Sequence, residues 1–300
     1  MIRPVRPTDL VGLALLQRRG YPNEAYGRRA LGRERDDWAD LFKVLNPLVS
    51  LEIRRHTLLF DDGDRLAGLV STLPFGRYWE VDRLIWPPDG RPQDCAELLR
   101  RLGLDAAQHG VERIYLRLSS DSPLLGAARA AGFVPYKAET LFRGGPVRLP
   151  DGSPPSGRPR RRGDDLALFR LYCRVVPVSV RQAEAMTLTE WRQWFRGGRQ
   201  LIVEEVGEPV LWARLTAADD QLQLTVEARD LSGPAVARHL GPFLSHHGGK
   251  KAVLGLVADY QPHVGAGLEQ LGFEPAGRFT CLVRHQAVRV KAQKLVPVRA

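Results

Sequence analysis

The chain has 300 residues, 44% of them hydrophobic and 26% charged, and a formal net charge of +10 at pH 7. This composition is typical of a globular protein, and the length favours two domains that each bury a core. No apolar run approaches the roughly 18 residues of a membrane span. The charge favours anionic partners and permits nucleic acid without indicating it, because 38 of the 44 basic residues are arginines, a bias that genome composition or heat adaptation also produces.

The first part of the chain is expected to begin with a short strand at 2–6 and a helix that Thr8 and Asp9 cap. A second helical region is expected at 28–45, where Asn46-Pro47 ends it. An Asp-Gly turn at 61–64 joins the strands of a hairpin. The remaining expected elements are strands at 57–60, 66–73, 78–86, 113–118 and 133–142, a helix with one apolar face from Cys95 to Ala106, and a helix at 122–131.

The stretch 83–102 connects an apolar strand end to the helix that contains Cys95 through a turn rich in Pro and Gly. A strand that enters a helix through a tight loop directs backbone amides and the positive helix end at one place. Such a loop can hold an anion such as a cofactor phosphate, although it is also an ordinary strand-to-helix connection.

A stretch rich in Gly, Pro and Ser at 143–157 shows no hydrophobic periodicity. We therefore expect an N-terminal domain at 1–145, a linker at 146–157 and a C-terminal domain at 158–300. After the linker the order of elements starts again. The expected elements are helices at 165–175, around Trp191 and Trp194, at 236–244 and at 264–271, and strands at 158–162, 201–203, 210–215, 222–226 and 252–257.

Two short motifs occur once in each part. Arg3-Pro4 followed by Asp9 recurs as Arg158-Pro159 followed by Asp164, and Gly132-Phe133 recurs as Gly272-Phe273. The same motifs in the same order at slightly different spacings indicate a duplicated domain. A repeat of this length implies two whole domains, not a solenoid.

Each part therefore has the order β-α-α-β-β-β-α-β-α-β. This order, with the Arg-Pro-x-x-x-x-Asp opening and the Gly-Phe before the last strand, resembles the GNAT superfamily of acyl-CoA-dependent N-acyltransferases over residues 1–143 and 158–290. The resemblance implies an α/β (α+β) fold of two tandem domains, each a mixed, mostly antiparallel sheet flanked by helices. It also implies transfer of an acyl group from acetyl-CoA or another acyl-CoA, as co-substrate, to a small-molecule or peptide amine.

In that family the fourth strand leads into a loop of pattern Gln/Arg-x-x-Gly-x-Gly/Ala, whose backbone amides hold the pyrophosphate of coenzyme A. The resemblance places the cofactor-binding residues at Arg91, Gln93, Asp94, Cys95 and Ala96 in the first copy and at Ser232, Gly233, Ala235 and Ala237 in the second. Asp94 stands where the central glycine belongs, and Ser232 replaces the long polar residue. The first copy keeps Arg91 and Ala96, which favours it as the active one.

The family often has a tyrosine four residues before the Gly of Gly-Phe, as general acid to the departing thiolate, and Ala128 and Leu268 occupy those positions here. A general base can come from the third or fourth strand. Glu80 and Asp82 are the catalytic candidates, with Glu227 in the second copy. Each of these carboxylates is also explained as an ordinary solvated charge on a strand face.

The cysteines and histidines indicate no metal site. Cys95, Cys173 and Cys281 form no CxxC pair, which argues against a disulfide framework or structural zinc and for a reducing cytosol. An exposed helix end explains His246-His247, since no carboxylate or cysteine is spaced as a co-ligand. Because Met1–Pro4 also lacks the apolar core of a secretory signal, we expect a cytoplasmic protein without a membrane anchor.

Two other functions remain open. The imperfect loops and missing tyrosines are also expected of a degenerate pair of domains that binds a ligand or partner without chemistry. The charge of +10 also suits a transferase that takes its acyl group from aminoacyl-tRNA. The sequence does not indicate the acceptor amine or the oligomeric state.

Overall fold

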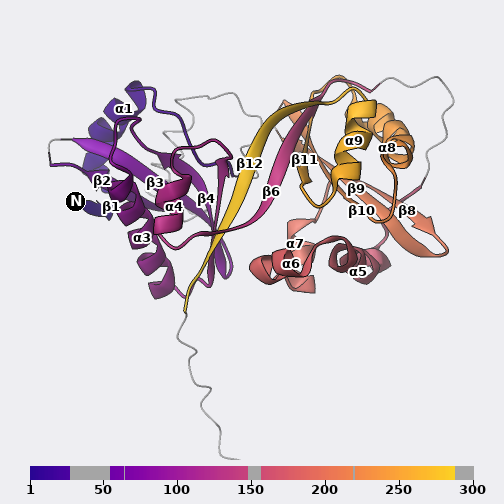
Figure 1. Cartoon of the computed structure of the whole chain (residues 1–300), viewed down its shortest axis with the longest axis horizontal. Helices are drawn as coiled ribbons and strands as arrows, with labels where there is room; N and C mark the ends of the chain where they lie inside the picture. The colour runs from indigo at the N-terminus through magenta and orange to yellow at the C-terminus, as the bar shows by residue number, and fades with distance from the viewer. Residues whose placement is uncertain (28–54, 64, 148–156, 219, 288–300) are drawn as a thin grey trace, which may run out of the picture.

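The computed structural model describes residues 1–27, 55–63, 65–147, 157–218 and 220–287 (Figure 1). The helix expected at 28–45, and residues after 287 that could extend the last strand, lie outside the described residues. No helix in the described ranges is long and apolar enough to cross a membrane.

The first half of the chain, up to residue 147, contains most of the expected elements. The structure has β1 (Ile2–Pro4), a short 3-10 helix η1 (Pro7–Asp9), α1 (Leu10–Arg18), β2 (His56–Asp61), β3 (Leu66–Phe75), β4 (Tyr78–Ile85), α3 (Pro92–Gln108), β5 (Arg113–Ser119), α4 (Leu125–Ala130) and β6 (Val134–Gly144).

The second half, from residue 157, follows the order expected from the sequence with one addition. It has β7 (Arg158–Pro159), a 3-10 helix η3 (Arg162–Asp164), α5 (Asp165–Val175), α6 (Val178–Glu184), α7 (Leu188–Trp194), β8 (Arg199–Glu205), β9 (Glu208–Ala218), β10 (Gln221–Ala228), α8 (Gly233–Gly248), β11 (Val253–Ala258), α9 (Pro262–Gln270) and β12 (Glu274–His285). The added element, α6, has no counterpart in the sequence prediction. It is only seven residues long, too short for a clear 3.6-residue period.

The repeated Arg-Pro motif forms the same ion pair in both halves. The two guanidinium nitrogens of Arg3 donate to Asp9 at 2.7 and 2.8 Å, and those of Arg158 donate to Asp164 at 2.8 Å each. Each aspartate also accepts the backbone N–H three residues before it. This planar two-pronged pair ties the first strand of each half to the helix that follows, which explains the fixed spacing of the motif.

The described strands form one sheet in which the last strands of the two halves are exchanged. The strand order is β1-β2-β3-β4-β5-β12-β6-β11-β10-β9-β8-β7. Thus β6, from the first half, pairs antiparallel with β11 of the second, and β12 pairs antiparallel with β5 of the first. Figure 1 shows β6 and β12 side by side across the middle of the molecule. The exchange joins the two halves through backbone hydrogen bonds.

Strict alternation along the strands gives each half a core on both faces of the sheet. In the first half, Leu58 packs in the core beneath α3, whereas Leu59 packs with Leu13 of α1 on the opposite face. In the second half, Leu211 packs toward α8, whereas Trp212 packs with Trp191 of α7. The helices α5 to α7 therefore cover the face of the second half on which the pocket described below opens.

Candidate functional site

Each half contains one pair of parallel strands that separate after three residues. In the first half, β4 and β5 pair from Tyr78 opposite Arg113 to Glu80 opposite Tyr115. In the second half, β10 and β11 pair from Leu222 opposite Val253 to Leu224 opposite Gly255. All four strands continue beyond the last pair. We call the space between β4 and β5 beyond these pairs the first gap and that between β10 and β11 the second gap. Separated strands present N–H and C=O groups that need other partners.

The first gap is filled by the protein's own backbone at residues 23–26. The Asn23 carboxamide accepts from the N–H of Leu84 at 2.9 Å and donates to the C=O of Asp82 at 3.0 Å. The next residue, Glu24, donates its N–H to the C=O of Leu84 at 2.8 Å, and Tyr26 donates its N–H to Arg117 of β5 at 2.9 Å. The segment therefore spans from β4 to β5 as an inserted piece of strand.

The second gap is closed by side chains. The Gln261 carboxamide accepts from the N–H of Ala228 at 3.0 Å and donates to the C=O of Val226 at 3.5 Å. The C=O of Ala228 lies 3.1 Å from Nε2 of His263. Among the described residues the isolated β-bridges are Asn23–Ile85 and Ala25–Leu118, both in the first gap. The second gap therefore holds no inserted strand from the described part of the chain.

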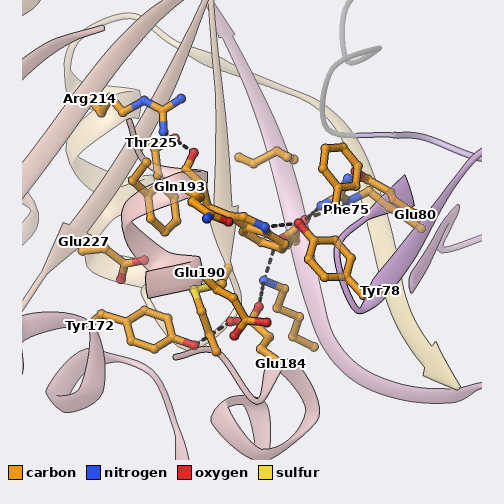
Figure 2. A pocket seen from close by; sticks show the side chains of 18 of the residues that line it. Phe75, Tyr78, Glu80, Tyr172, Glu184, Glu190, Gln193, Arg214, Thr225 and Glu227 are labelled. Carbon is orange, nitrogen blue, oxygen red and sulfur yellow. Dashed lines mark hydrogen bonds and ion pairs between the residues drawn. The ribbon is translucent and has the colours of Figure 1, made fainter. Parts of the chain in front are cut away.

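A pocket of about 840 Å³ reaches the second gap. Its lining includes Val226, Ala258 and Gln261 beside that gap, and it continues under α6 and α7 toward β4 and β5. Figure 2 shows Phe75, Tyr78 and Glu80 from the first half on one side of it and Tyr172, Glu184 and Glu227 from the second half on the other. The exchanged strands bring the two sets of side chains together.

A buried network of charged side chains crosses this pocket. The Lys137 ammonium lies 3.0 Å from Glu139 and 2.8 Å from Glu184, and Arg117 lies 2.8 Å from Glu139. Tyr172 donates its hydroxyl to Glu184 at 2.7 Å. Burial alone lowers the pKa of Lys137, but the two carboxylates outweigh it and hold that pKa well above its usual value. The two carboxylates therefore favour the charged form of Lys137.

Glu227 and Tyr260 stand at the end of the pocket beside the second gap. Glu227 is 8% exposed and accepts a hydrogen bond from Nε2 of Gln261 at 3.2 Å. Burial raises the pKa of the Tyr260 hydroxyl; Lys137 opposes this rise and Glu227 adds to it. The hydroxyl is therefore protonated near neutral pH, as a proton donor must be. A carboxylate and a phenol next to an open strand edge are the groups that proton transfer requires.

A turn between α6 and α7 holds Glu184 in place. Ala185 has a left-handed φ of 41°, which is unusual for a residue with a Cβ. The C=O of Glu184 accepts hydrogen bonds from Arg113 and from Tyr115 of β5, and Trp194 donates to the Tyr78 hydroxyl of β4. Strained non-glycine residues persist where surrounding contacts fix them, often at functional sites. The first half therefore fixes the helices that cover the pocket.

The two candidate bases on β4 lie in different surroundings. Glu80 lines the pocket at its first-half end. Asp82 is the bulged residue of β4, since the register with β3 shifts between Val81 and Arg83. It is 8% exposed and forms an ion pair with Arg55. Burial raises its pKa, although Arg55 opposes the rise.

The first predicted cofactor loop divides between surface and core. Arg91 and Gln93 are exposed, and Arg91 forms a long ion pair of 3.9 Å with Asp94. Cys95 and Ala96 belong to the core beneath α3, with side chains 0% and 1% exposed. Burial, with a smaller contribution from Glu24, raises the pKa of Cys95 to about 12. Only backbone groups of Cys95 and Ala96 could meet a phosphate.

The second predicted loop begins α8 with a capping residue. The Ser232 hydroxyl accepts from the N–H of Ala235 at 3.4 Å. A Cβ on Gly233 would approach the Cβ of Ala266 to 3.0 Å, so this glycine allows α8 and α9 to pack closely. Ala237 is half-buried on the same helix. Pro92 and Pro234 occupy the first turns of α3 and α8 and remove one amide donor from each helix start.

Other residues that stood out in the sequence have structural roles. Trp191 is fully buried in the core of α5 to α7, and Trp194 joins the halves at the pocket. His246 and His247 end α8, where they pack against each other. Within the described ranges, no three His, Cys, Asp or Glu side chains are grouped in a way that could hold a metal ion.

Sequence reasoning missed most of the pocket. It did not single out Lys137, Glu139, Glu184, Tyr172, Tyr260 or Gln261. One signal was present in the sequence: Lys137 and Glu139 alternate on one face of a strand otherwise expected to be buried, an arrangement that requires partners. Those partners come from β5 and α6, and only the exchange of β6 between the halves brings them together.

Comparisons with known proteins were made by sequence and by structure. No family model matches the sequence, and no curated protein matches it significantly. The structure is similar to a GCN5-related N-acetyltransferase from Sphaerobacter thermophilus, with a TM-score of 0.60 and 15% identity, over 96% of each chain. It is also similar to a tandem GNAT protein from the clavulanic acid biosynthesis pathway, with a TM-score of 0.50 and 16% identity, over 97% of this chain and 99% of that one.

These likenesses extend over nearly the whole chain. The sequence-based expectation of the fold is confirmed. The chain has the fold of the GCN5-related N-acetyltransferases.

Proposed function

We propose that the protein is an N-acyltransferase whose acyl-CoA binds in the second gap and whose amine acceptor binds in the adjoining pocket. One observation carries the proposal: the pocket reaches the gap that is closed only by side chains, whereas the other gap is filled by backbone. The proposal therefore moves the active copy from the first half, which the loop residues favoured, to the second. The first half would act as a wall of the acceptor pocket.

The second gap suits the pantetheine arm of coenzyme A, a narrow chain with two amide groups. Such an arm can pair with a strand edge as an added peptide strand does. The C=O of Val226 and the N–H of Ala228, which now bond the Gln261 carboxamide, would pair with the N–H of one pantetheine amide and the C=O of the other. The pyrophosphate would then lie near the start of α8, at the N–H of Gly233 and the hydroxyl of Ser232.

Glu227 and Tyr260 supply the proton transfers. The amine nitrogen attacks the thioester carbonyl carbon, a C–N bond forms, and the C–S bond breaks. Glu227 accepts the proton that the amine loses, directly or through one water, and Tyr260 donates a proton to the departing sulfur. Tyr260 lines the pocket together with Glu227, which supports this role.

The experiment is an acyl-transfer assay with acetyl-CoA and a panel of amines, in which released thiol is measured. Glu227→Gln is compared with Glu80→Gln, because both carboxylates line the pocket, one in each half. We expect Glu227→Gln to lower kcat by roughly 100-fold or more and Glu80→Gln to leave kcat nearly unchanged. Loss of kcat with Glu80→Gln alone would instead place the chemistry in the first half.

A binding module without chemistry is the second candidate, and one observation favours it. A carboxamide occupies the equivalent backbone groups in both gaps, which satisfies them in the absence of any ligand. On this alternative the folded protein would show no turnover with any amine. Turnover above background that depends on Glu227 would reject it.

A further inference from the structure

The carboxamides of Asn23 and Gln261 occupy equivalent places in the two halves. The parallel pairs Glu80–Tyr115 and Leu224–Gly255 are the last of their ladders. Counted from these pairs, Asp82 and Leu84 lie as far along β4 as Val226 and Ala228 lie along β10, although β4 has a bulge at Asp82. The Asn23 carboxamide bonds the C=O of Asp82 and the N–H of Leu84. The Gln261 carboxamide bonds the C=O of Val226 and the N–H of Ala228. Two unrelated segments thus supply the same amide to the same backbone groups.

The two carboxamides differ in what holds them. Asn23 belongs to a segment that bridges to both strands, so that its removal would require backbone to leave the sheet. Gln261 precedes α9 as its N-cap, and its hydrogen bonds to β10 come from its side chain, whereas its backbone N–H bonds Ala258 at the end of β11. A side chain can change rotamer without unfolding the helix that follows it. The second gap can therefore open while the first stays closed.

Gln261 also contacts the proposed base. The same Nε2 that donates to Val226 lies 3.2 Å from a carboxylate oxygen of Glu227. Gln261 is 3% exposed and Glu227 is 8% exposed, so neither contact is a loose surface interaction. Any movement that takes the carboxamide off β10 also ends its hydrogen bond to Glu227.

We propose that Gln261 is a latch: the two pantetheine amides replace its carboxamide on β10, and this displacement ends the hydrogen bond that Gln261 donates to Glu227 before Glu227 receives the acceptor's proton. This inference rests on the proposed function. It adds an order to the reaction, in which acyl-CoA binds first and the amine second.

The exchange of one amide for another explains why the latch can open. Between them, the two ligand amides make the hydrogen bonds to β10 that Gln261 gives up, so the direct cost of opening is the lost contact between Gln261 and Glu227. Removing the competing carboxamide should therefore strengthen coenzyme A binding roughly three- to tenfold, the equivalent of one net hydrogen bond.

The test is calorimetric titration of coenzyme A into the wild-type chain, Gln261→Ala and Asn23→Ala, with circular dichroism to verify folding. We expect tighter binding to Gln261→Ala and unchanged binding to Asn23→Ala, the matched carboxamide of the first half. Gln261→Leu, which keeps most of the side-chain volume, replaces the alanine variant if that variant does not fold. Unchanged or weaker binding to the Gln261 variants, with wild-type binding intact, would overturn the latch and leave the proposed function standing.

Initial-rate kinetics give a second and independent measurement. The wild-type chain should show ordered binding with acyl-CoA first, and Gln261→Ala should bind the two substrates in either order. Ordered kinetics in both proteins would contradict the link to Glu227. If no variant binds coenzyme A and no amine is acylated, the proposed function fails and the latch falls with it.

Discussion

Lys137→Met tests whether the buried charges of the pocket are arranged as described. The Lys137 side chain is 6% exposed, and its ammonium lies 3.0 Å from Glu139 and 2.8 Å from Glu184. Methionine has a similar length and no charge, so the change leaves Glu184 without its cation while Arg117 still neutralises Glu139. Removing one partner of a buried ion pair typically costs about 3–5 kcal/mol of unfolding free energy.

The second step restores charge balance. Lys137→Met combined with Glu184→Gln removes one charge of each sign, and the new amide can still accept the Tyr172 hydroxyl. We expect the double variant to recover most of the loss, since replacing both members of a buried pair is often nearly neutral. The deficit of the single variant should also shrink at pH 5, where one buried carboxylate can take up a proton.

The assay is urea denaturation at pH 7 and pH 5, followed by circular dichroism and extrapolated to zero denaturant. Arg174→Met is the control, because its ion pair with Glu208 is about half exposed on both sides and its loss should not be measurable. A single-variant cost below about 1 kcal/mol, with no recovery in the double variant, would refute the buried pair.

Two further predictions concern buried or paired side chains. The hydrogen bonds from Arg3 and Arg158 hold the pKa of Asp9 and of Asp164 below the usual 3.8. A carboxyl whose pKa is lower in the folded than in the unfolded state stabilises the fold above its unfolded-state pKa, and this stability is lost as the pH falls through its folded-state pKa. The double variant Asp9→Asn, Asp164→Asn should therefore show a flatter fall of the urea midpoint below about pH 4. An unchanged slope would contradict this. Burial raises the pKa of Cys95 and Cys281 to about 12, so iodoacetamide at pH 8 should modify half-exposed Cys173 first in the native protein and the other two only after denaturation. Peptide mass spectrometry reads this out, and equal modification of Cys95 would count against the packing beneath α3.

The sequence located most elements because local patterns have local causes. The alternation along 222–226 and the apolar face from Cys95 to Ala106 arise from the geometry of single strands and helices, and both were found where expected. The Arg3 and Arg158 motifs also proved informative, since each joins residues only six apart. Candidates such as Glu80 could be placed on a strand but not in a site.

The contents of the two gaps could not be read in the same way. Asn23 meets Leu84 across 61 residues, and Gln261 meets Ala228 across 33. Nothing near either carboxamide in the sequence indicates which backbone groups it satisfies. The loop at Arg91, which matched the family pattern better, lies beside the gap that residues 23–26 fill. Its match therefore said little about whether that half has room for a ligand.

By itself, the sequence determined the element order, its duplication and the fold, because hydrophobic period, turns and caps act over a few residues. The tertiary structure decided which half has the pocket. The closing strand of each half pairs with the other half, and this exchange brings Lys137 and Glu139 to Arg117 and Glu184. Pairing between strands depends on the sheet as a whole, and no stretch of the sequence specifies its partner strand alone.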